Sequence, residues 1–121
     1  MSGTDEFYDD LETRDPEQRE EDLMAALLAQ IAHAKANAPH YGEAFADLDP
    51  ADINSRAALA AMPTTRKSDL AALQKKNPPL GGLNTVPLSE LSHIFASPGG
   101  LYEPDADRKD YWRYARALWA A

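Results

Sequence analysis

The sequence predicts a mostly α-helical fold with a minor β component, and it predicts that this fold is incomplete. Apolar residues recur at the three- and four-residue spacing of amphipathic helices over much of the chain. Aspartate, serine and proline stand where helices begin and end, and they divide the chain into short helical segments. Residues 92–96 form the only convincing strand.

Composition places the chain among ordinary globular proteins. It has 121 residues, of which 44% are hydrophobic and 26% charged, which suits one domain or part of a larger one. Cysteine is absent, which excludes disulfides, thiolate metal sites and cysteine nucleophiles. No apolar run reaches the roughly 20 residues that span a bilayer, and the acidic N-terminus does not resemble a secretory signal. We therefore expect a cytoplasmic protein without a membrane partner.

The net charge of −8 belongs to the N-terminal segment. Residues 1–22 hold ten acidic and two basic side chains, and the remainder is neutral. We interpret residues 1–14 as an acidic, solvated arm that leads into a helix, with binding of a basic partner as the alternative. A nucleic-acid partner is not expected, because backbone phosphates require a basic surface.

The first predicted helix begins at Asp15-Pro16 and ends before Pro39. Asp15 suits the N-cap, Pro16 suits the first helical position, and Gln18 completes a capping-box pattern. Its apolar stripe consists of Leu23, Leu27, Ile31 and Ala34. This stripe needs a covering surface.

Shorter elements are expected up to residue 82. They are a helix over residues 41–48, a single turn capped by Asp49, a helix from Ser55 to Ala61, a helix capped by Thr65 that ends before Pro78, and a turn at Gly81-Gly82.

The C-terminal part is predicted to run from the strand at 92–96 through a loop, 97–104, into a last helix that Asp107 caps. This helix would carry Tyr111, Trp112, Tyr114, Ala115, Leu118 and Trp119. A lone strand leaves its backbone groups unpaired, and so aromatic a helix needs a partner surface. Both features indicate the N-terminal part of a longer protein, cut at Ala121.

The loop 97–104 is the best candidate for chemistry. Glycine lets backbone N–H groups approach an anion closely, and a hydroxyl adds a donor. The predicted cofactor-binding residues are Ser97, Gly99 and Gly100, although composition alone favours a plain turn from strand to helix.

Other polar residues carry less information. The histidines, His33, His40 and His93, match no metal-ligand spacing, and no catalytic set is predicted. Arg66-Lys67 is interpreted as an exposed basic pair, with contact to an anion or a neighbouring domain as the alternative.

The order of several short segments resembles the start of the phenylacetate-CoA ligase family, within the adenylate-forming (AMP-dependent) synthetases. The resemblance extends from Tyr8 to Ala121. The matching segments are Tyr8 with 11–14, then 31–35, 38–41, 59–63, 66–70, 79–83, 93–99, Tyr111-Trp112 and 115–118.

The phosphate-binding loop of this family, Ser-Ser-Gly-Thr-Thr-Gly-Lys-Pro, falls on residues 97–104. Ser97, Gly99 and Pro104 match it, whereas Glu103 stands where the family has lysine. A carboxylate repels a triphosphate. Either the loop is rebuilt in a divergent branch, or the chemistry of this branch has changed.

The resemblance implies that residues 15–121 are the N-terminal part of an AMP-binding domain. Helices over 15–76 would cap it, the strand at 92–96 would join its sheet, and the loop would face the nucleotide. The implied reaction joins a small carboxylic acid to ATP, with Mg²⁺, and then transfers the acyl group to coenzyme A.

The implied partner is the remainder of the same large domain, and a homodimer is compatible with the resemblance. The catalytic groups of the family lie beyond these residues, so the 121-residue chain alone is expected to be inactive. The alternatives are a helical protein-interaction module, which would use the arm and residues 108–121, and a protein of ligase ancestry without the activity.

Overall fold

The computed structural model describes residues 6–121, so the first five residues of the predicted acidic arm lie outside the description. Its helices are α1 (Pro16–Asn37), α2 (Pro39–Ala44), α3 (Arg56–Ala60), α4 (Lys67–Lys76) and α5 (Ala115–Trp119). Its strands are β1 (Leu91–Ala96) and β2 (Tyr102–Ala106), and short 3-10 turns lie at Asp10–Thr13, Pro50–Asp52 and Leu88–Glu90. About half of the described residues are helical and two short strands pair, so the predicted combination of helices with minor β-structure is found, with less helix than expected. None of the helices in the described part of the chain is long and apolar enough to cross a membrane.

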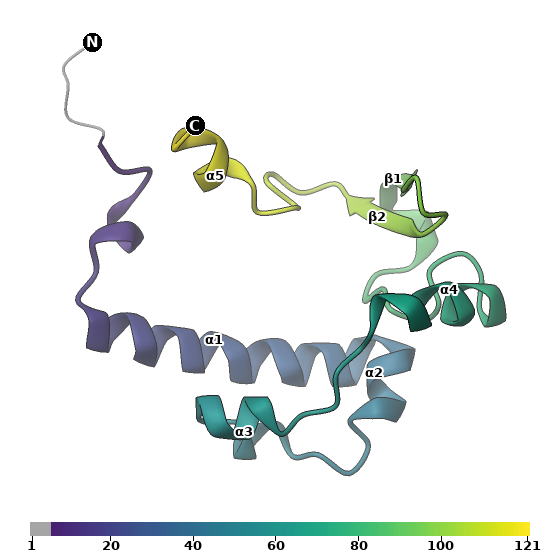
Figure 1. The fold of residues 1–121 in the computed structure, drawn as a ribbon, viewed down its shortest axis with the longest axis horizontal. Helices are drawn as coiled ribbons and strands as arrows, with labels where there is room; N and C mark the ends of the chain where they lie inside the picture. Colours follow the sequence, from purple (N-terminus) through teal and green to yellow (C-terminus); the bar gives the residue numbers. More distant parts are fainter. Residues whose placement is uncertain (1–5) are drawn as a thin grey trace.

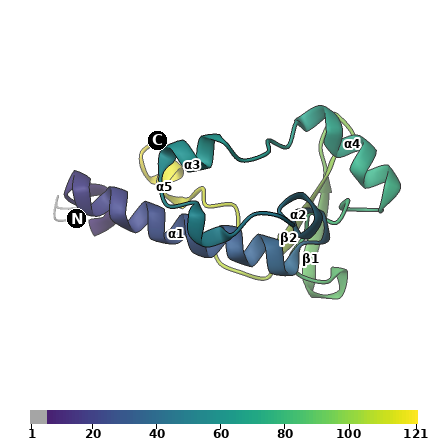
Figure 2. The same cartoon turned by 90° about the horizontal axis from the view of Figure 1, so that it is seen from below.

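The long helix α1 runs across the arrangement, with α3 on one side of it and α5 and the hairpin on the other (Figure 1). Residues 6–14 of the arm and α5 lie toward its N-terminal end, whereas α2, α4 and the β-hairpin lie toward its C-terminal end. The view from below shows α3 running beside α1 (Figure 2). A two-pronged ion pair from Arg56 to Glu20, at 2.7 and 2.8 Å, joins these two helices.

The start and end of α1 follow the prediction. The carboxylate of Asp15 accepts from the N–H groups of Glu17 and Gln18, and α1 ends at Asn37, where Ala38 before Pro39 is extended. The side chain of Gln18 donates to Asp22 at 2.9 Å, so the capping box is only half formed. The backbone N–H groups at the start of α1 are therefore satisfied mainly by the carboxylate of Asp15.

The apolar stripe of α1 is covered only in its C-terminal half. Ile31 is buried with Phe45 and Ile53, whereas Leu23 is 47% exposed. Partly buried side chains complete this core: Leu27, Tyr41, Leu48, Ala58 and Met62. The core thus lies between α1, α2, the turn at 50–52 and α3.

The short helices follow the predicted caps with two corrections. The carboxylate of Asp49 accepts from Ala51 at 2.9 Å, and the hydroxyl of Ser55 accepts from Ala58 at 3.2 Å, as expected. The helix predicted over 41–48 occupies Pro39–Ala44 instead, because Pro39 takes a first-turn position and residues 45–48 relax into turns. Thr65 is not a cap: Arg66 holds that position without a side-chain hydrogen bond.

Gly81 and Gly82 form a turn that packs against α2 and α4. Both have positive φ angles, +69° and +72°. A Cβ on Gly81 would lie 3.0 Å from the carbonyl carbon and Cβ of Leu73, and the carbonyl of Gly82 accepts from the N–H of His40 at 2.9 Å. Glycine is therefore required here by both conformation and space.

The prediction for residues 102–114 is wrong. Residues 102–106 form strand β2, antiparallel to β1, instead of the loop and helix lead-in expected there. The last helix does not begin after Asp107, because Asp110 (φ +49°) and Arg113 (φ +60°) adopt left-handed conformations that interrupt a helix. Only Ala115–Trp119 is helical.

The described part of the acidic arm contacts α5. Arg116 forms an ion pair with Asp9, and its guanidinium lies 5.7 Å from the centre of the Tyr8 ring. The Tyr8 and Trp119 rings meet edge to face at 6.0 Å. The arm, interpreted from sequence as a solvated lead-in, is mainly exposed yet is attached to the C-terminal helix.

We predict that Gly81→Ala destabilises the chain more than Gly100→Ala. Both positions have positive φ, which costs an L-residue about 1–2 kcal/mol, but a Cβ at Gly100 meets no atom within 4 Å whereas one at Gly81 meets Leu73. Urea unfolding of the two variants measures the difference. Equal losses of unfolding free energy would show that the contact with Leu73 is unimportant.

We also predict that acid releases the arm from α5. The ion pair with Arg116 lowers the pKa of Asp9 below its ordinary value of 3.8. Its contribution is therefore complete above pH 3.8 and is lost as the pH falls through the lowered folded-state pKa. Trp119 fluorescence, read in a Trp112→Phe background, should change in that range, and Asp9→Asn should abolish the transition whereas Asp10→Asn retains it.

Candidate functional site

The predicted anion-binding residues lie in the tight turn that joins β1 to β2. The N–H of Ser97 donates to the carbonyl of Leu101 at 2.8 Å, and the N–H of Gly100 donates back to the carbonyl of Ser97 at 2.9 Å. The Ser97 hydroxyl accepts from the N–H of Leu101 at 3.2 Å. Gly100 has a φ of +77°, which closes the turn. Ser97, Gly99 and Gly100 thus lie within one tight turn.

The donors of this turn are largely engaged within it. Three of its backbone N–H groups have partners inside the hairpin, and Pro98 has no N–H to offer. Because a strand follows the turn, no helix N-terminus adds positive potential there. An anion at the turn would compete with these internal hydrogen bonds, so phosphate binding by Ser97, Gly99 and Gly100 stays a prediction.

Glu103 lies beside the turn on β2. It pairs with Phe95 across the hairpin, and both residues are exposed. A full negative charge stands two residues beyond the turn, and it disfavours a second anion in the same place. The negative charge of Glu103, which stands where the resembled family has lysine, therefore lies beside the candidate turn.

Gln74 fixes the hairpin to α4. Its side-chain amide donates to the carbonyl of Tyr102 at 2.8 Å, and its amide oxygen accepts from the N–H of Tyr102 at 2.9 Å. Gln74 is only 8% exposed, and Leu80 and Leu101 are buried as well. Sequence reasoning missed Gln74, because a glutamine near the end of a helix carries no signal of its long-range partner.

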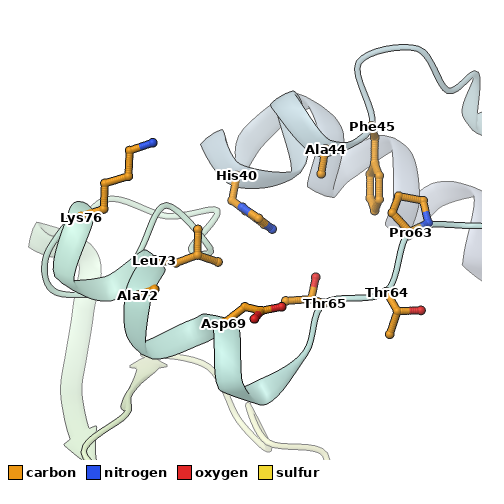
Figure 3. A pocket seen from close by; sticks show the side chains of 10 residues that line it. All are labelled: His40, Ala44, Phe45, Pro63, Thr64, Thr65, Asp69, Ala72, Leu73 and Lys76. Atoms are coloured by element: carbon orange, nitrogen blue, oxygen red, sulfur yellow. The ribbon is translucent and has the colours of Figure 1, made fainter.

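A hollow of about 390 Å³ lies between α2 and α4 (Figure 3). His40 on α2 faces Thr65 and Asp69 across it, and Phe45 and Pro63 close one end. Lys76 lies at the other end. The volume is at the lower limit of small-molecule pockets. Sequence analysis did not predict this hollow, because its walls come from segments that are distant along the chain.

The remaining polar residues are placed as surface groups. Within residues 6–121, no three or more acidic or histidine side chains are arranged to hold a metal ion. His33 is exposed and contacts Asn37 on the next turn of α1. Arg66 and Lys67 are exposed at the start of α4. His93 lies 3.1 Å from Asp105 across the hairpin.

Comparison with known proteins shows that the chain resembles solved structures in its fold but matches no known family in its sequence. No protein family and no curated protein matches the sequence. Crystal structures of 2-hydroxyisobutyryl-CoA ligase do match. The complex with R3-HIB-AMP in the postadenylation state has a TM-score of 0.77 and 24% identity, and the match covers 88% of this chain and 24% of the ligase chain.

The same ligase with 2-HIB-AMP and CoA, in the thioesterification state, gives a TM-score of 0.74 at 24% identity, again over 88% of this chain. The chain therefore shares the fold of part of 2-hydroxyisobutyryl-CoA ligase and spans about a quarter of the length of the solved ligase chain.

We predict that Gln74→Met loosens the hairpin from α4. Methionine keeps the length of the side chain but leaves the N–H and carbonyl of Tyr102 without their protein partners. Each lost hydrogen bond costs about 0.5–1.5 kcal/mol. The free energy of unfolding should fall accordingly, and the amide of Tyr102 should exchange faster. Gln30→Met, at an exposed position on α1, is the matched control and should leave both quantities unchanged.

Proposed function

We propose that this chain is the N-terminal part of the large domain of an AMP-forming acyl-CoA ligase. The observation that carries this proposal is the fold match to a CoA ligase over 88% of the chain at a TM-score of 0.77. The match covers most of the chain, so it exceeds what one common motif would give. The ordered segments that resemble the phenylacetate-CoA ligase family support the same assignment.

The proposed reaction converts a small carboxylic acid and ATP into an acyl-adenylate and pyrophosphate, and then into a CoA thioester. The solved ligase is bound to an acyl-AMP compound and, in one state, to CoA. We infer that ATP, with Mg²⁺, and CoA serve the longer protein in the same way. The turn at Ser97, Gly99 and Gly100 would lie toward the phosphates. Among its backbone N–H groups, that of Gly99 is the donor not engaged within the described hairpin.

The 121-residue chain by itself is expected to be inactive. Adenylation requires groups that position the carboxylate and stabilise the charge that develops on the phosphate. In the described residues the donors of the turn are largely engaged internally, and Glu103 opposes an anion. The remaining groups would have to come from the other part of the ligase.

An interaction module is the second candidate, and the surface of α5 favours it. Leu118 is 75% exposed, Tyr114 62% and Trp119 51%. An apolar surface of this kind usually contacts another protein or another part of the same protein. In the ligase proposal the remainder of the large domain covers it, whereas in the module proposal a separate protein does.

The decisive experiment is the intact mass of the native protein, followed by an activity assay on that protein. We expect a mass several times 13.3 kDa and release of pyrophosphate that depends on ATP, Mg²⁺ and an acid from a panel containing phenylacetate and 2-hydroxyisobutyrate. A CoA-dependent thioester should follow.

A native mass of 13.3 kDa would contradict the ligase proposal and leave the interaction module. A longer protein that releases no pyrophosphate with any acid of the panel would instead indicate ligase ancestry without activity, with Glu103 as its first explanation. Omission of Mg²⁺ is the control, because metal-free ATP should give no product.

A further inference from the structure

The two outer edges of the β-hairpin differ in their capacity to accept another strand. In an antiparallel pair, residues alternate between those that bond to the partner strand and those whose N–H and carbonyl groups point outward. The bond from the Ser97 N–H to the Leu101 carbonyl fixes this alternation. By this register, the backbone N–H and carbonyl groups of Phe95 and Glu103 point toward each other. Those of the Ala96–Tyr102 and Ile94–Pro104 pairs point away from the partner strand.

The outer edge of β2 is closed. The outward N–H and carbonyl of Tyr102 are both bonded to the side-chain amide of Gln74, at 2.9 and 2.8 Å. The next outward position is Pro104, which has no N–H to donate. A strand placed against β2 would lose two successive donors, and proline is a known device for protecting a sheet edge.

The outer edge of β1 is open. The outward-pointing backbone groups of Ile94 and Ala96 have no hydrogen-bond partner outside the hairpin in the described chain. Residues 92–96 are all exposed. No charged side chain or proline stands within β1 to block strand addition.

Both faces of β1 carry uncovered large apolar side chains. Ile94 is 42% exposed and Phe95 is 49% exposed, and successive residues of a strand point to opposite faces. A strand with apolar groups on both faces is typical of a sheet that is covered on both sides. An added peptide or a second copy of the hairpin would extend the sheet without covering both faces.

We propose that the hairpin is extended on its β1 side by a strand from the remaining part of the large domain, and that it ends that sheet on its β2 side. This inference rests on the proposed function. The length of chain required is available there, since these residues span 24% of the solved ligase. Gln74 thereby has a second role: it blocks strand addition at β2 and so leaves β1 as the edge that pairs.

Hydrogen exchange in the longer native protein, resolved to single amides, tests the proposal. The amides of Ile94 and Ala96 should exchange at least about tenfold more slowly than in an unstructured chain, as amides in a stable ladder do. Phe95, whose N–H bonds to β2, is the internal control and should be protected in any case. Rapid exchange at Ile94 and Ala96 beside a protected Phe95 overturns the proposal.

A pair of substitutions gives an independent measurement. Ile94→Pro removes the outward N–H, and Pro104 directly opposite shows that the hairpin tolerates proline at an outward position. Ile94→Ala removes the apolar side chain but keeps the N–H. We expect Ile94→Pro to lower the Tm of the longer protein by about 2–4 °C more than Ile94→Ala, the shift that one lost hydrogen bond gives in a domain of ordinary size. Equal shifts contradict the proposal.

The two proposals fail in different ways. Thioester formation together with rapid exchange at Ile94 and Ala96 would leave the ligase assignment intact and overturn the pairing. Protected amides in a longer protein without activity would support the pairing and contradict the function. Protection that varies with protein concentration would identify a second copy as the occupant and overturn the proposed one.

Discussion

The pair of hydrogen bonds between Gln74 and Tyr102 is the interaction on which the rest of the arrangement depends. It joins a helix to a hairpin that lies 28 residues further along the chain. A two-stranded hairpin is marginally stable on its own, so its position relative to α4 requires such an attachment. Gly81 packs closely against α4 next to Gln74, because a Cβ at this position would lie 3.0 Å from Leu73 and 3.1 Å from the backbone nitrogen of Gln74.

This junction also makes the two outer edges of the hairpin different. An amide side chain satisfies one donor and one acceptor, and here it satisfies both outward groups of Tyr102. The same contact that positions the turn at residues 97–101 therefore makes the two sheet edges unequal. The two hydrogen bonds between Gln74 and Tyr102 thus both hold the hairpin on α4 and leave β1 as the edge that can pair with another strand.

Several apolar surfaces of the described chain are uncovered, which supports the proposal that the chain is part of a larger domain. The core around Ile31, Phe45 and Ile53 covers only the C-terminal half of the α1 stripe. Exposed apolar side chains remain at Leu23, on β1 and on α5. Area removed from water contributes roughly 25 cal/mol per Å², so covering these surfaces would add substantially to the stability of the whole.

The sequence by itself determined several of the helix starts and ends, because capping and proline sterics act within four residues. Asp15, Asp49 and Ser55 cap as predicted, and α1 and α4 end just before prolines. It also indicated the glycine turn, the first strand and the place of the candidate loop. Only the tertiary structure decided that residues 102–106 form a strand, since a strand depends on its partner strand. Pro104 is tolerated there because its backbone nitrogen faces away from β1 and is not needed for pairing. The role of Gln74 and the hollow between α2 and α4 arise from contacts between distant segments, and local sequence carries no signal for such contacts.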